Sequence, residues 1–177
     1  MPTGELAAPA VSLAEAQAYV RIETGEEEAV LAGLVRTATA MCEQFTGRVI
    51  LARGFSETVN GCGEWQRLSL TPVRSIDTVE LMGTDGSASP LTAGAYAIDI
   101  DSAGDGWVRM MPGMGAARLR VSGTVGMATD SNDVPEPIRQ GILRLTAHLF
   151  NARDGGGGDP PAAVTALWRP YRRMRIL

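Results

Sequence analysis

The sequence contains no lysine, and all 16 of its cationic side chains are arginine. This absence excludes mechanisms that need a lysine amine, such as Walker phosphate loops, Schiff bases and Ser-Lys dyads. A single histidine, His148, excludes a histidine-based metal cluster, and the two cysteines lack C-x-x-C spacing, so we expect no zinc site. Two cysteines in 177 residues also do not make a disulfide scaffold, and we expect Cys42 and Cys62 to be unbridged.

Long apolar runs are missing as well. No run approaches the roughly 20 residues that span a bilayer, and the opening residues, MPTGELAAPAVS, have neither a basic nor an apolar region of a signal peptide. We therefore expect a soluble protein that is made in the cytoplasm. A net charge of -4 argues against a general nucleic-acid-binding protein, because neutralising phosphates requires clustered cations.

The charges that are present are unevenly distributed. Residues 1–28 hold six acids against the single cation Arg21, whereas the last ten residues hold four arginines and no acid. The two ends of the chain are therefore opposite in charge, which favours contacts with two unlike partners.

Apolar spacing predicts helices near both ends of the chain. Ser12 and Glu15 have the spacing of a capping box, which predicts a short helix over 13–21. Acids after Gly25 open a second helix that ends at Gly47, a third begins at 134–137, and a short fourth runs from 160 to 167. We expect their apolar stripes to pack against other helices or subunits, with Leu31, Leu34, Met41, Phe45, Ile142, Leu145 and Leu149 as the packing residues.

The middle of the chain has a different texture, with short β-branched runs separated by glycine, proline and aspartate turns. It predicts strands at 50–59, 66–70, 75–82, 95–100, 107–111 and 117–124. The fold class is therefore α+β, a small bundle of N- and C-terminal helices with an inserted antiparallel β module, either sandwich or barrel. The expected division is a helix pair (1–48), the β-rich insertion (49–126), C-terminal helices (127–167) and a basic aromatic tail (168–177).

Motifs for chemistry are weak throughout. The stretch 99–106 begins like a calcium loop, but Ala103 and Met110 occupy ligand positions, so we expect a hairpin turn. The Gly-x-Gly sequences at 61–63 and 113–115 lack the third glycine of a dinucleotide site, and no serine lies in a G-x-S-x-G elbow. We predict no catalytic residue, metal or cofactor. A small α+β enzyme or ligand-binding domain with an unrecognised site remains the alternative, and a perturbed carboxylate in a large apolar pocket would support it.

The C-terminal ten residues combine two large aromatics with arginines, residue types that dominate interface hot spots. They follow a glycine run at 155–158, so we expect a tail that is mobile in the free subunit and docks on a partner. The predicted interaction residues are Trp168, Arg169, Tyr171, Arg172, Arg173 and Arg175.

Two blocks of sequence resemble the head-to-tail connector, or adaptor, family of long-tailed phages and gene transfer agents. The first opens with SLAEAQAYVRI at 12–22 and ends with CEQFTGR at 42–48. The second opens with VPEPIRQGIL at 134–143, continues through His148 and 151–153, and ends with LWRPYRRMR at 167–175. Together the blocks cover about half the chain, and the β-rich middle matches only loosely.

The resemblance implies a structural virion protein, with no reaction and no cofactor. It implies a ring of twelve copies in the particle neck, bound to the portal above and to a stopper or tail-terminator protein below, around a channel through which DNA passes. We predict that the C-terminal residues from Trp168 to Arg175 dock on the portal. Another tail-completion protein would have the same composition, and whether the source is a phage or a gene transfer agent is open.

Overall fold

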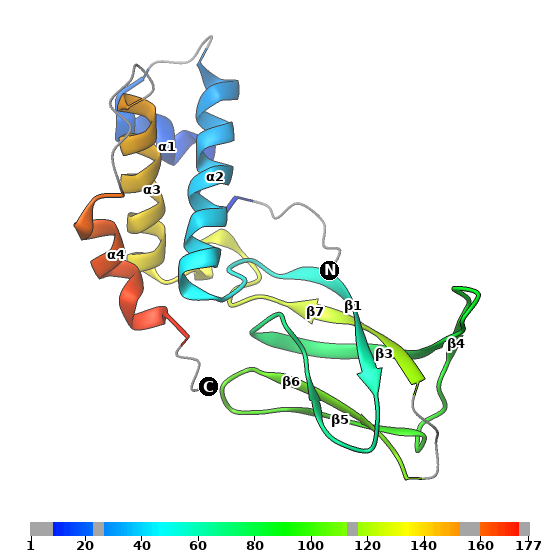
Figure 1. Ribbon diagram of the computed structural model, residues 1–177. Helices are drawn as coiled ribbons and strands as arrows, with labels where there is room; N and C mark the ends of the chain where they lie inside the picture. The colour runs from blue at the N-terminus through cyan, green and yellow to red at the C-terminus, as the bar shows by residue number, and fades with distance from the viewer. Residues whose placement is uncertain (1–8, 23–26, 113–116, 153–159, 174–177) are drawn as a thin grey trace. The chain divides into compact units, whose positions relative to one another are not determined.

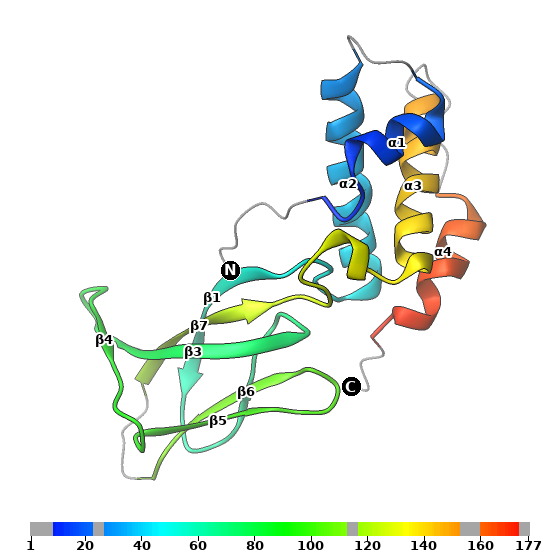
Figure 2. The same ribbon diagram turned by 180° about the vertical axis from the view of Figure 1, so that it is seen from behind.

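The computed structural model describes residues 9–22, 27–112, 117–152 and 160–173. Contacts divide the chain into two compact units, and the ribbons of Figures 1 and 2 show both. The helical unit comprises residues 7–51 and 128–177, and the β unit is inserted into it at 52–127. The predicted α+β class with an inserted antiparallel β module is confirmed.

Four α-helices of the described residues build the helical unit (Figure 1). Their apolar stripes meet in one core. They are α1 (Leu13–Val20), α2 (Glu28–Thr46), α3 (Glu136–Asn151) and α4 (Ala162–Trp168), with short 3-10 turns η1 (Ser131–Asp133) and η2 (Arg169–Tyr171). Helix α3 packs between α2 and α4, and α1 packs against both α2 and α3. The described part of the chain has no helix long and apolar enough to cross a membrane.

The predicted helix ends are confirmed in their capping chemistry. The Ser12 hydroxyl accepts a hydrogen bond from the Glu15 backbone N–H, and the Glu15 carboxylate accepts one from the Ser12 backbone N–H, which is the reciprocal pattern of a capping box. Gly47 ends α2 at a φ of 67°, and its N–H donates to the Glu43 carbonyl. A left-handed residue is least strained as glycine, so this position fixes where α2 stops.

Two antiparallel sheets form the β unit. The first has the strand order β1-β7-β3-β4 and the second the order β2-β6-β5, and neither closes into a barrel within the described residues. The strands are β1 (Arg53–Gly61), β2 (Gln66–Arg67), β3 (Val73–Met82), β4 (Ala88–Pro90), β5 (Tyr96–Ile100), β6 (Gly106–Met110) and β7 (Ala117–Val125).

The sheets face each other across a core of alternating side chains, as in a sandwich. Leu119, Val121, Gly123 and Val125 are the buried positions of β7, at every second residue. At the end of β1, a Cβ on Gly61 would lie 2.6 Å from the Met110 sulfur and 2.7 Å from Leu119 Cγ, so side chains of β6 and β7 meet over this glycine.

Two predicted strands had a boundary that was wrong by three residues, and one strand was missed. The first strand begins at Arg53, because Ile50 and Leu51 are buried in the core of the helical unit. The second is two residues long. The strand β4 was not predicted, because its sequence Ala-Ser-Pro has low strand propensity and its proline is tolerated only at such an edge position.

The aspartate-rich turn is confirmed as a hairpin, with Ile100 of β5 paired to Gly106 of β6. The Asp101 carboxylate accepts hydrogen bonds from the backbone N–H groups of Ala103 and Asp105, both at 2.9 Å, and from the Trp107 indole N–H at 3.0 Å. The indole contact, followed by the backbone contacts, holds the pKa of Asp101 below its ordinary value. The Asp101 carboxylate therefore accepts the hydrogen bonds that stabilise this turn.

Candidate functional site

Trp168 is the buried member of the predicted interaction residues that the structure describes. It is the last residue of α4, and its side chain is 2% exposed in the core of the helical unit. Its indole N–H donates to the Ile138 carbonyl at 3.3 Å, and its ring lies 5.9 Å from the Phe45 ring. The sequence-based expectation of a mobile Trp168 was wrong, because this large apolar ring packs in the core of its own unit.

A glycine on α3, Gly141, leaves the space that the Trp168 ring occupies. A Cβ placed on Gly141 would lie 2.0 Å from the Trp168 indole nitrogen and under 3 Å from two of its ring carbons. Because Gly141 has no side chain, the Trp168 ring of α4 packs directly on the backbone of α3, and the two helices approach closely at this point.

The residues after Trp168 are attached to the end of α2. Arg48 Nε donates to the Tyr171 carbonyl at 3.2 Å, and the Arg173 backbone N–H donates to the Thr46 carbonyl at 2.9 Å. The guanidinium of Arg172 lies 5.7 Å from the centre of the Phe45 ring, within range of a cation–π contact. The ends of the two sequence blocks, CEQFTGR and LWRPYRR, therefore meet in space.

Four of the predicted interaction residues lie beyond the core. Arg169 and Arg172 are exposed, whereas Tyr171 and Arg173 are half-buried at the junction with α2. Arg175 lies outside the described residues, as do the glycines at 155–158. The junction of residues 45–48 with 168–173 thus presents two exposed guanidinium groups on a fixed backbone.

The predicted packing residues all lie in or against the core of the helical unit. Leu31, Ile142 and Leu145 are at most 1% exposed. The other four, partly buried and packed against that core, are Leu34, Met41, Phe45 and Leu149.

An apolar groove adjoins this junction. It has a volume of about 280 Å³ and is lined by side chains of α2, of α4 and of a proline two positions before α4, namely Met41, Gln44, Phe45, Pro160, Thr165 and Trp168. None of these six side chains is charged. Sequence reasoning missed the groove, because its lining comes from segments more than 100 residues apart that look like ordinary stripe positions.

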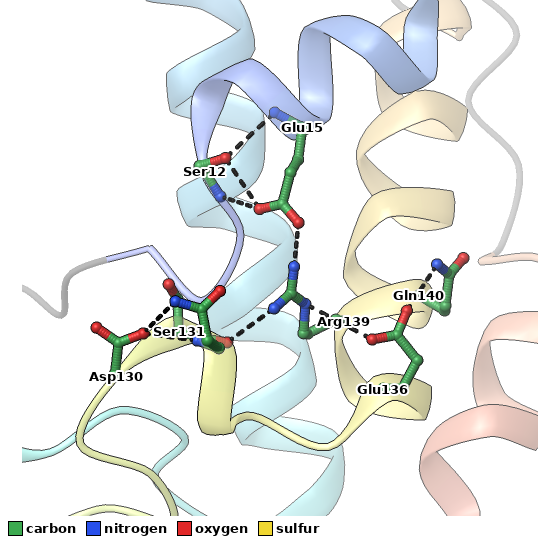
Figure 3. Close-up of polar contacts among 8 residues, drawn as sticks. Ser12, Glu15, Asp130, Ser131, Glu136, Arg139 and Gln140 are labelled. Atoms are coloured by element: carbon green, nitrogen blue, oxygen red, sulfur yellow. Dashed lines mark hydrogen bonds and ion pairs between the residues drawn. The ribbon is translucent and has the colours of Figure 1, made fainter.

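A cluster of polar side chains links α1 to α3 (Figure 3). The Arg139 guanidinium pairs with the Glu15 carboxylate and donates to the Ser131 carbonyl at 3.1 Å, while its Nε lies 3.9 Å from Glu136. Its side chain is only 15% exposed. The cluster links the first helix, the loop before α3 and α3 itself, so its role is to hold the helical unit together.

The same cluster makes stability depend on pH. Hydrogen bonding by the Ser12 backbone lowers the pKa of Glu15 against the effect of burial, and the Ser12 hydroxyl and Arg139 lower it further. A lowered folded-state pKa means that the ionised Glu15 stabilises the fold above the unfolded pKa, and that this stabilisation is lost as pH falls through the folded pKa. We expect Glu15→Gln to be less stable than the wild type at neutral pH and to approach it below about pH 4.

Urea unfolding at several pH values, followed by far-ultraviolet circular dichroism, measures this difference. Glu64→Gln changes the net charge equally at an exposed residue and serves as the control. A wild-type to Glu15→Gln difference that stays constant from neutral pH to pH 3 would show that the Glu15 charge does not stabilise α1.

Among the described residues, no group of three or more metal-ligating side chains is found. The carboxyl groups with shifted pKa values, those of Glu15, Asp85 and Asp101, are all lowered, and none lines the groove. Cys42 is a free, buried thiol whose pKa is raised by burial, which makes it a poor nucleophile.

Comparison with solved structures gives strong matches over the whole chain. A chain in the virion of a native gene transfer agent particle matches with a TM-score of 0.81 and 25% identity, covering 100% of this chain and 97% of that one. A chain in the neck of an empty particle computed with C6 symmetry matches with a TM-score of 0.81, 26% identity and the same coverage. The neck of a native particle computed with C12 symmetry matches in fold, with a TM-score of 0.79 and 24% identity.

The chain has the fold of a gene transfer agent neck protein. The resemblance predicted from the two sequence blocks is thereby confirmed. No family model and no curated protein matches the sequence.

The neck-protein fold accounts for both units, because each match spans the whole chain. The matched chains are components of virions rather than enzymes. The junction of the C-terminal residues with α2 belongs to this shared fold and is the candidate interaction site.

Proposed function

We propose that this neck protein is a head-to-tail connector, one subunit of a ring that joins the portal of the head to the tail-joining proteins below. The observation that carries the proposal is the full-length match to neck structures at a TM-score of 0.81. The two sequence blocks that carry the resemblance end at the junction of α2 with the C-terminal segment. Their order along the chain supports the same assignment.

The ring would contain twelve copies, in agreement with a matched neck computed with C12 symmetry. Identical subunits close a ring only when each uses two different surfaces at a fixed rotation. Portal and tail-side partners then meet opposite ends of every subunit. The acidic N-terminal region and the arginine-rich C-terminal region suit two such unlike partners, because complementary charge steers each to its own end.

The C-terminal junction is the proposed portal contact. Arg169 and Arg172 are exposed and available to acidic or carbonyl groups of the portal, and Tyr171, Arg173 and Arg175 extend the same segment. Trp168 takes part through the core, since its buried ring fixes where the segment leaves α4.

The ring would surround the channel through which DNA leaves the head. A net charge of -4 fits a channel wall that does not retain the DNA, because nonspecific retention comes from clustered cations that neutralise phosphates. The chain would therefore contact DNA without sequence preference, and its lower partner would be a stopper or tail-terminator protein.

An electron-microscopy map of the assembled neck, into which this chain is fitted, tests the proposal. We expect twelve copies directly below the portal, with the junction of residues 45–48 and 168–173 on the portal side. Density for the chain only further down the tail would identify it as another tail-completion protein. A different symmetry at this level would contradict the twelve-subunit ring.

A further inference from the structure

The groove beside the C-terminal junction has the size and lining of a socket for a side chain. Its volume of about 280 Å³ lies just below the roughly 300 to 1,000 Å³ of small-molecule sites. Such sites also need convergent polar groups, and here the Thr165 hydroxyl is already bonded to the Ala162 carbonyl of its own helix. The groove therefore suits an apolar side chain better than a cofactor.

The described residues cover the apolar stripe of α2 incompletely at this point. Met41 and Phe45 pack against the core yet remain partly exposed and line the groove, and Trp168 lines it from α4. Burying apolar surface stabilises an interface by about 25 cal/mol for each Å² removed from water. An occupant that covers these side chains therefore gains affinity from atoms that the described residues leave partly exposed.

The rim of the groove is cationic. The exposed guanidinium of Arg172 lies 5.7 Å from the centre of the Phe45 ring, one of the lining residues, and a second exposed arginine, Arg169, follows Trp168 in the chain. With no acid among the six lining side chains, an acidic occupant meets attraction at the rim and no opposing charge inside. This asymmetry selects a segment that carries an apolar side chain next to carboxylates.

We propose that the groove seats one large apolar side chain from an acidic segment of the portal protein. The inference rests on the proposed function and adds to it the chemistry of the partner. The portal is the occupant favoured by continuity, since Phe45 and Trp168 both line the groove and Phe45 also contacts Arg172 of the proposed portal contact. The apolar side chain supplies buried area, and the carboxylates pair with Arg169 and Arg172.

Filling the groove tests the proposal. Thr165→Phe places a large ring in the groove from α4, whereas Ala166→Phe adds the same ring at the next, exposed position outside the lining. Binding to purified portal protein of the same particle is measured by surface plasmon resonance. We expect Thr165→Phe to weaken binding about tenfold or more, as for a hot-spot anchor, and Ala166→Phe to leave it unchanged.

A charge variant that does not change packing guards against misfolding. Gln44 lines the groove and is exposed, so Gln44→Glu adds a negative charge of nearly the same shape. It should weaken portal binding, with the loss shrinking as salt is raised. Wild-type binding that both Thr165→Phe and Gln44→Glu retain would overturn the groove proposal while the connector function stands.

Two further outcomes separate the inference from the proposed function. If the wild type does not bind portal protein and is absent from the neck, the connector function itself is wrong. If Thr165→Phe blocks association between copies of this chain but leaves portal binding intact, the occupant is a neighbouring subunit and the portal assignment is overturned.

Discussion

Gly141→Ala is expected to destabilise the helical unit by about 2 to 4 kcal/mol, although alanine is the better helix former. The added Cβ would lie 2.0 Å from the Trp168 indole nitrogen and within 3 Å of two further ring atoms. The ring is rigid and 2% exposed, so either it leaves the core or α3 and α4 move apart. Overpacking costs about 1 to 3 kcal/mol, and losing a buried tryptophan about 3 to 5 kcal/mol.

Gly33→Ala is the matched control for this prediction. Gly33 also lies inside a long helix, α2, but a Cβ there would meet only the Arg36 guanidinium at 3.9 Å. This variant should therefore gain the helix propensity of alanine, about 0.5 to 1 kcal/mol. Urea unfolding followed by far-ultraviolet circular dichroism compares them. A Gly141→Ala variant as stable as Gly33→Ala would show that Trp168 does not rest on α3 at this glycine.

The pairing of Gly141 with Trp168 explains why the sequence misled at the C-terminus. Tryptophan after the last apolar stripe, followed by arginines, has the composition of an exposed hot spot. Its burial depends on a missing side chain 27 positions earlier, and a glycine inside a helix carries no signal of what lies on it. Propensity alone marks Gly141 as a weak point of α3.

Local signals predicted the helical unit well. The Ser12–Glu15 capping box and Gly47 act within one turn of chain, so their chemistry could be inferred without knowing the fold. The 3.6-residue stripe of α2 likewise identified Leu31, Phe45 and their neighbours as packing positions. The Glu15–Arg139 pair was not predictable, because it joins residues 124 positions apart.

Long-range packing also set the limits in the β unit. Ile50 and Leu51 have the β-branched and aliphatic character of a strand, yet the core of the helical unit buries them before β1 begins. The register of β7 with both β1 and β3 requires knowledge of three separated segments, so strand order could not follow from alternation alone. Alternation did give the existence of the longer strands.

Truncation at two adjacent positions is expected to separate folding from partner binding. A chain ending at Trp168 loses the Arg48–Tyr171 and Arg173–Thr46 hydrogen bonds and the Arg172–Phe45 contact, each a net contribution of about 1 kcal/mol. A chain ending at Leu167 also loses the buried indole, at about 3 to 5 kcal/mol. The first should be folded, and the second much less stable in urea.

The pair is well matched because both chains place the new terminal carboxylate at the end of α4, where the helix dipole disfavours it equally. Their stability difference therefore reports on Trp168 alone, and equal stability would contradict its place in the core.

The chain ending at Trp168 then isolates the portal contact, since it is folded but lacks every exposed arginine of the segment. Particles carrying it should contain heads that fail to acquire tails. If they join at the normal yield, residues 169–177 are not the portal anchor, and the groove lined by Phe45 and Trp168 would have to bind its partner without them.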